Sequence, residues 1–239
     1  MVGSLLAVAG VVSITVSIWL AAKYVKFNRR QNSAGLTGQQ VARQILDENG
    51  LGHIAVKATG SILFGNSYSH YFKKVRLRRF TRHETSLTSL GMGAQKAALA
   101  LLDKEGDPDM RKRIRLVPLI TFGPFSFVPL LAIGALFDYF VFDGTGYCTL
   151  VLGILGFLFF GYSILLSVLT LKTERKAQER AYAILEEKQM ITAKELADLK
   201  TLFHLYNVQY VNDIILAALE LIYLALEIAS AVNGGSVKS

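Results

Sequence analysis

The sequence has little cysteine and little charge. Cys148 is the only cysteine among 239 residues, which excludes a disulfide scaffold and every zinc or iron–sulfur site built on several cysteines. Charged residues make up 18% of the chain, whereas soluble domains average about 25%. Hydrophobic residues make up 52%, so a long disordered chain is excluded as well. The class that remains is an integral membrane protein.

Four long segments are almost free of charge, and each is close to the ~20 residues that cross a bilayer as a helix. The sequence therefore predicts a mainly α-helical membrane protein with four transmembrane helices and a small α+β domain between the first two. The expected segments are span one at 2–24, the extramembrane domain at 25–115, a proline-kinked span two at 116–142, span three at 144–171, an extramembrane helical segment at 172–203, span four at 204–232 and a tail at 233–239.

The basic residues are distributed unevenly between the two sides of these spans. Residues 23–115 hold 18 Lys and Arg and residues 172–200 hold seven, so that only Lys238 lies elsewhere. Under the positive-inside rule both segments face the cytoplasm or matrix, and the termini face the opposite side. Because its basic residues follow the first span, we expect an uncleaved signal anchor. The expected location is a bacterial plasma membrane or the mitochondrial inner membrane.

Six basic residues form a cluster in the extramembrane domain, named the basic cluster below. Juxtamembrane basic residues determine topology or contact anionic lipids. We expect no nucleic-acid binding, because the sequence lacks the aromatic platforms on which single strands stack. The basic cluster consists of Lys73, Lys74, Arg76, Arg78, Arg79 and Arg82.

Local signals predict the elements of the domain. Thr37 with Gln40 and Thr192 with Glu195 have the spacing of capping boxes at helix starts. Asp107-Pro108 has the residue types of a helix cap and first helical position. β-Branched and aromatic residues at 54–77 indicate short strands, and small residues at 85–103 indicate a closely packed helix.

Several short motifs recur in the order and spacing of a known family. They are Ser33-Ala34-Gly35-Leu36-Thr37-Gly38, Val41-Ala42-Arg43, Ile45-Leu46-Asp47, Asn49-Gly50-Leu51, Tyr68 with Lys73, Val75-Arg76-Leu77, Leu116-Val117-Pro118, and Glu174 with Ala177, Arg180 and Ala181. These motifs resemble the YugP-type membrane zinc metallopeptidases between Ser33 and Leu226. The resemblance implies a zincin-like fold for the domain at 25–115.

That family binds zinc through a helical His-Glu-x-x-His motif, in which both histidines lie on one helix face and the glutamate activates the metal-bound water. In register, the resemblance places the motif on Gln95-Lys96-Ala97-Ala98-Leu99. Gln95 and Leu99 replace the two histidines, and Lys96 replaces the glutamate. Only Glu174 matches a family ligand. The resemblance thus predicts a degenerate member with no catalytic residue and no metal cofactor, and hence not an enzyme. An alternative stays open: a peptidase with unconventional ligands, Glu174 with His70 and His83.

Span four carries three acidic residues at a spacing of seven, which places them near one helix face. They are Asp213, Glu220 and Glu227. A carboxylate inside a bilayer costs about 2.5–3.5 kcal/mol on insertion scales, so the central Glu220 is either protonated and hydrogen-bonded or in contact with another subunit. A role in proton handling or transport is a third alternative.

These observations predict a non-catalytic accessory subunit of a larger inner-membrane complex. The expected partners are other membrane-protein subunits and anionic lipids. A respiratory or ATP-synthesising assembly is the expected setting, by analogy with complexes that recruit retired enzymes.

Overall fold

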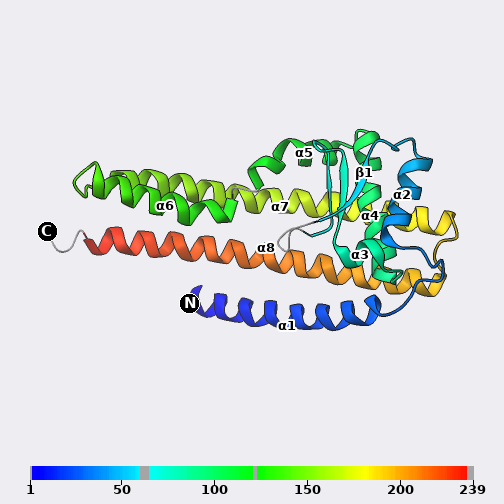
Figure 1. Cartoon of the computed structure of the whole chain (residues 1–239). Coiled ribbons are helices and arrows are strands. Elements are labelled where there is room, and N and C mark those ends of the chain that lie inside the picture. The colour runs from blue at the N-terminus through cyan, green and yellow to red at the C-terminus, as the bar shows by residue number, and fades with distance from the viewer. Residues whose placement is uncertain (1, 60–64, 121–122, 236–239) are drawn as a thin grey trace. The chain divides into compact units, whose positions relative to one another are not determined.

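The computed structural model describes residues 2–59, 65–120 and 123–235, which form eight helices and three strands (Figure 1). The helices are α1 (Val2–Asn28), α2 (Gly38–Glu48), α3 (Arg79–His83), α4 (Leu87–Lys104), α5 (Pro108–Ile120), α6 (Gly123–Phe140), α7 (Tyr147–Glu187) and α8 (Ala193–Gly235). The strands are β1 (Ala55–Ala58), β2 (Ser67–Ser69) and β3 (Lys74–Leu77). The chain divides into an apolar unit (1–15, 115–170 and 210–239) and a core unit (16–114 and 171–209).

Three helices are long and apolar enough to cross a membrane by length and composition: Leu6–Asn28, Tyr147–Glu187 and Ala193–Leu226. This confirms the prediction of a mainly helical membrane protein and supports three of the four predicted spans. Within predicted span two, the structure describes α5 as far as Ile120 and α6 from Gly123 onward. Within α6 the apolar helix Phe127–Phe140 is shorter than a span.

The outer bounds of the predicted segments stay predictions. α7 continues without a break from predicted span three into the predicted extramembrane segment, and α8 begins at Ala193 and continues through predicted span four. Residues 121–122 of predicted span two and residues 236–239 of the predicted tail lie outside the described residues.

The predicted helix starts are confirmed. Thr37 and Gln40 form a complete capping box at α2. At α8 the Thr192 amide and hydroxyl donate to Glu195, whose own amide donates to the Thr192 hydroxyl. The Asp107 carboxylate accepts the amides of residues 109 and 110 and so caps α5.

The short strands predicted between residues 54 and 77 are also present, and the described residues form three of them. They form one sheet in the order β1-β3-β2, with β1 parallel and β2 antiparallel to the central β3. Tyr68 of β2 lies opposite Val75 of β3, and both side chains are buried. The sheet therefore contributes one apolar face to the core.

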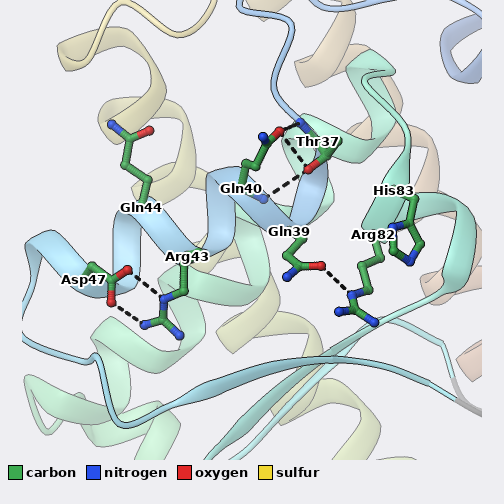
Figure 2. Close-up of a pocket in the computed structure, with 8 residues that line it drawn as sticks. All are labelled: Thr37, Gln39, Gln40, Arg43, Gln44, Asp47, Arg82 and His83. Atoms are coloured by element: carbon green, nitrogen blue, oxygen red, sulfur yellow. Dashed lines mark hydrogen bonds and ion pairs between the residues drawn. The ribbon is translucent and has the colours of Figure 1, made fainter.

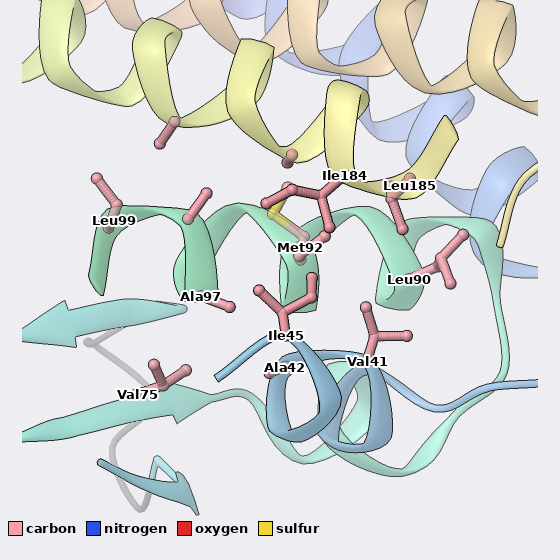
Figure 3. Packing of buried hydrophobic residues seen from close by; sticks show 14 of the residues in the cluster. Val41, Ala42, Ile45, Val75, Leu90, Met92, Ala97, Leu99, Ile184 and Leu185 are labelled. Carbon is pink, nitrogen blue, oxygen red and sulfur yellow. The ribbon is translucent and has the colours of Figure 1, made fainter. Parts of the chain in front are cut away.

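The core unit is built around α4, whose residues from Leu87 to Leu102 are all buried. Figure 3 shows Ile45 of α2 on one side of α4 and Leu185 of α7 on the other. The α2–α4 approach needs glycine, because a Cβ on Gly93 would lie 2.3 Å from the carbonyl oxygen of Gly38. The small residues predicted for close packing thus bring the backbones of α2 and α4 together.

In the apolar unit, a buried carboxylate closes the turn between α6 and α7. Asp138 accepts hydrogen bonds from the amides of Cys148 (2.9 Å) and Thr149 (2.8 Å) at the start of α7. Gly134 of α6 permits a close approach there, because an added Cβ would lie 2.6 Å from the Cα of Thr149. The α6–α7 hairpin is therefore a tightly packed pair.

Candidate functional site

Three of the four positions that the resemblance assigns to the metal site and its base, Gln95, Lys96 and Glu174, meet in the core unit. α4 presents Gln95 and Lys96 toward Glu174 of α7: the Gln95 Nε2 and the Lys96 Nζ donate to the same carboxylate oxygen, Oε2, at 2.9 and 2.8 Å. The other oxygen, Oε1, accepts from the guanidinium of Arg113, on α5, at 2.8 Å. Three helices therefore converge on one carboxylate.

The cluster is enclosed, and its charges determine the state of the carboxylate. The side chains of Lys96, Arg113 and Glu174 are 9%, 14% and 17% exposed. Burial raises the pKa of Glu174, but the charges and hydrogen bonds of Lys96 and Arg113 outweigh that effect and lower the pKa to about 2. Glu174 is therefore an anion between two cations at neutral pH.

Leu99 lies one helical turn beyond Gln95 and takes no part in this polar cluster. Its side chain is fully buried in the hydrophobic core of the domain. Hydrogen bonds thus join Gln95, Lys96 and Glu174, three of the four positions that the resemblance assigns. The fourth, Leu99, is a packing residue. The assignment of the family motif to Gln95, Lys96 and Leu99 stays a prediction.

The residues of this cluster do not fit a zinc ion. Zinc is bound by thiolate, imidazole and carboxylate ligands, whereas the cluster offers one carboxylate, an amide, an ammonium and a guanidinium. Both oxygens of Glu174 already accept hydrogen bonds from cations. Within residues 2–59, 65–120 and 123–235, no group of three or more His, Cys, Asp or Glu residues could hold a metal.

The alternative ligand set is not brought together either. The Nδ1 of His70 lies 2.6 Å from the Oδ2 of Asp103. His83, at the end of α3, lines a polar pocket with Arg82 and residues of α2 such as Gln39 and Arg43 (Figure 2). Glu174 binds Gln95, Lys96 and Arg113 instead. The prediction of a site from Glu174, His70 and His83 is therefore wrong for the described residues, because the fold places the three in different surroundings.

The sequence did not predict the polar contacts of Asp103 or those of Arg113. Asp103, at the end of α4, accepts a 2.5 Å hydrogen bond from the hydroxyl of Tyr68 and also contacts His70. Burial and the bond to Asp103 raise the pKa of Tyr68. Arg113 was missed as well, because nothing in the local pattern of α5 distinguishes it from neighbouring basic residues.

The remaining predicted residues lie apart from this cluster. The basic cluster occupies the turn after β2, strand β3 and helix α3. On α8, Asp213 and Glu220 are exposed, and Asp213 has an interaction of its own. Glu227 belongs to α8, but its side chain lies outside the described residues.

The comparisons with known proteins define the class of this chain. It belongs to the family described as "Putative neutral zinc metallopeptidase", which matches residues 3–229. It is also similar to the "Putative membrane protease YugP" of Bacillus subtilis (strain 168), with 24% identity over 216 residues that cover 89% of this chain and 91% of the relative. No solved structure matches the chain.

These findings confirm the resemblance and correct one prediction. The prediction that the chain is not an enzyme is contradicted, because both the family and the relative are named as proteolytic. That prediction rested on one helix, whereas the family match extends over nearly the whole chain. Family membership thus indicates a peptidase class, although the cluster around Glu174 does not fit zinc.

Proposed function

We propose that this chain acts as an accessory subunit of a larger membrane complex, in which its apolar helices contact other membrane-protein subunits. A respiratory or ATP-synthesising assembly of an inner membrane is the proposed setting. The support comes from the apolar helices and from one acidic residue that lies on them.

That residue is Glu220, which is exposed on α8 within the apolar unit. No hydrogen bond or ion pair to Glu220 occurs among the described residues. Neighbouring positions of α8 are apolar and exposed, including Ile215 and Ile222. Because an isolated carboxylate in hydrocarbon is costly, a partner subunit that supplies a hydrogen-bond donor or a cation would stabilise it. The exposure of Glu220 carries the proposal.

The test compares the tagged full chain with two variants after purification in a mild detergent. Glu220→Leu removes the carboxylate from the apolar face. Glu187→Gln is the matched control, because Glu187 is an exposed residue at the end of α7 and belongs to the core unit. We expect the wild type and Glu187→Gln to co-purify stoichiometric partner chains and Glu220→Leu to lose at least one of them. A monomeric wild type without partner chains would overturn the proposal.

Peptide-bond hydrolysis is a second candidate function, which the name of the family and that of the relative favour. Its test measures zinc bound per chain and cleavage of a membrane-protein substrate with and without a chelator. Stoichiometric zinc together with chelator-sensitive cleavage would establish this function. Absence of both would leave the accessory role as the better account.

A further inference from the structure

The turn between β2 and β3 presents two aromatic side chains to the outside. Tyr71 is 62% exposed and Phe72 is 66% exposed. Lys73 completes the turn in the left-handed region, with φ of 45°. Two cations of β3 lie over the Phe72 ring: the Lys74 Nζ at 4.7 Å and the Arg76 Cζ at 5.5 Å from its centroid. The tip of the sheet therefore combines exposed aromatic surface with positive charge.

This tip lies beside the point where the chain becomes apolar. The Tyr71 hydroxyl donates a 3.0 Å hydrogen bond to the carbonyl oxygen of Ile114 in α5, and the uncharged segment begins two residues later, at Leu116. The tip of the sheet thus lies next to an element that leads into an apolar segment.

The positive charges here have no ion-pair partner among the described residues. None of the six residues of the basic cluster forms an ion pair with a carboxylate in the part of the chain that the structure describes. Other cations of the core unit do so: Arg43 pairs with Asp47 and Lys176 with Asp107. The basic cluster is therefore available to an acidic partner from outside the chain.

We propose that the β2–β3 turn and the basic cluster bind anionic phospholipid headgroups. Tyr71 and Phe72 enter the interface between headgroups and acyl chains, where aromatic side chains are favoured. The cations attract the phosphates, and the two contributions together give stable attachment. This surface would attach the core unit to an anionic lipid surface, independently of any partner subunit that Glu220 contacts.

The test titrates phosphatidylglycerol or phosphatidylcholine into detergent solutions of the full chain and follows the thermal unfolding temperature. Lys73→Gln with Lys74→Gln removes two charges of the basic cluster. Lys194→Gln with Lys200→Gln is the matched control, because both residues are exposed in the first turns of α8 and belong to the core unit but not to the basic cluster. A third variant, Tyr71→Ser with Phe72→Ser, removes the aromatic tip.

We expect phosphatidylglycerol, and not phosphatidylcholine, to raise the unfolding temperature of the wild type and of the control pair. Each basic residue near an anionic surface contributes about a fivefold factor in affinity, so the Lys73 and Lys74 variant should need roughly 25-fold more lipid. The variant Tyr71→Ser with Phe72→Ser should also bind phosphatidylglycerol more weakly than the wild type. This loss of affinity should remain at high salt, because salt screens charges and not apolar contacts.

The proposal would be overturned if phosphatidylcholine raised the unfolding temperature as much as phosphatidylglycerol does. It would also be overturned if Lys194→Gln with Lys200→Gln weakened lipid binding as much as Lys73→Gln with Lys74→Gln. A parallel titration with poly-glutamate and with an oligonucleotide tests other acidic partners. Stabilisation by either of these without stabilisation by phosphatidylglycerol would overturn it as well.

Discussion

The ammonium of Lys96 lies 2.8 Å from the carboxylate of Glu174, inside the core unit. The resemblance assigns one of these residues to the position of a peptidase's general base and the other to the position of its third metal ligand. Arg113 binds the opposite oxygen, so the enclosed cluster holds two cations and one anion. This imbalance predicts that the three side chains differ in their effect on stability.

Glu174→Gln should destabilise the chain far more than Lys96→Met. The glutamine variant leaves Lys96 and Arg113 facing each other without an anion, and breaking a buried pair in this way costs about 3 kcal/mol or more. Lys96→Met leaves a balanced pair of Arg113 and Glu174, at a cost of roughly 1 kcal/mol.

Thermal unfolding of the full chain in detergent measures both variants. For a chain of this size the expected fall for Glu174→Gln is about 6–12 °C, at roughly 2–4 °C per kcal/mol. Lys96→Met added to Glu174→Gln should recover part of the loss, because it removes one of the two uncompensated cations. A double variant no more stable than Glu174→Gln would contradict the proposed charge imbalance.

The same carboxylate should make stability depend on pH in the acid range. The pKa of Glu174 falls to about 2 in the folded chain from its ordinary 4.5, so the unfolded chain binds a proton more readily than the folded one. The stability that Glu174 contributes is complete above pH 4.5 and is lost as pH falls toward 2. The total loss is roughly 3 kcal/mol.

Unfolding temperatures between pH 5 and pH 3 should therefore fall more steeply for the wild type than for Glu174→Gln. Other carboxylates titrate in both proteins, so the difference between the two slopes isolates Glu174. Parallel curves would show that this carboxylate is not held in the ionised state by its two neighbours.

Gly93→Ala should destabilise the chain although alanine favours helices. The added methyl would lie 2.3 Å from the backbone oxygen of Gly38, and a backbone atom cannot move aside without separating α2 from α4. Overpacking of this kind costs about 1–3 kcal/mol, which exceeds the gain of up to about 1 kcal/mol from helix propensity.

Gly10→Ala is the matched control, because an added methyl there meets nothing within 4 Å of the chain. The unfolding temperature of Gly10→Ala should equal or slightly exceed that of the wild type. A Gly93→Ala variant as stable as this control would refute the close approach of the two helices.

Glu195→Ala should loosen the connection between α8 and the segment that follows α1. Glu195 is almost fully buried and accepts hydrogen bonds from the Ser33 amide at 2.8 Å and the Ser33 hydroxyl at 2.6 Å, besides its bonds to Thr192. Loss of several bonds to a charged acceptor costs about 2–3 kcal/mol. Ser33→Ala removes one of these bonds and should cost about 1 kcal/mol.

Limited proteolysis of the full chain in detergent follows this connection, with cleavage between residues 28 and 38 as the readout. Cleavage should be fastest in Glu195→Ala, intermediate in Ser33→Ala and slowest in the wild type. The same rate in all three proteins would mean that Glu195 has no part in holding this segment.

The sequence by itself determined the membrane class, the helix starts and the family. These properties depend on short-range patterns: the uncharged segment 144–171, which supplies most of α7, the capping pair of Thr192 and Glu195, and motif spacing along nearly the whole chain. Each can be deduced from neighbours in the chain, because helix capping and bilayer insertion act on contiguous residues.

Only the tertiary structure decided which charges meet. Glu174 is 61 residues from Arg113 and 78 from Lys96 along the chain, and no local pattern distinguishes those two cations from 24 others among the 26 Lys and Arg residues. Their convergence depends on how α4, α5 and α7 pack. That packing is determined by close contacts at glycines and by the volumes of the buried apolar side chains. The scarcity of charge is thus visible in the composition, whereas the pairing of the buried charges depends on long-range packing.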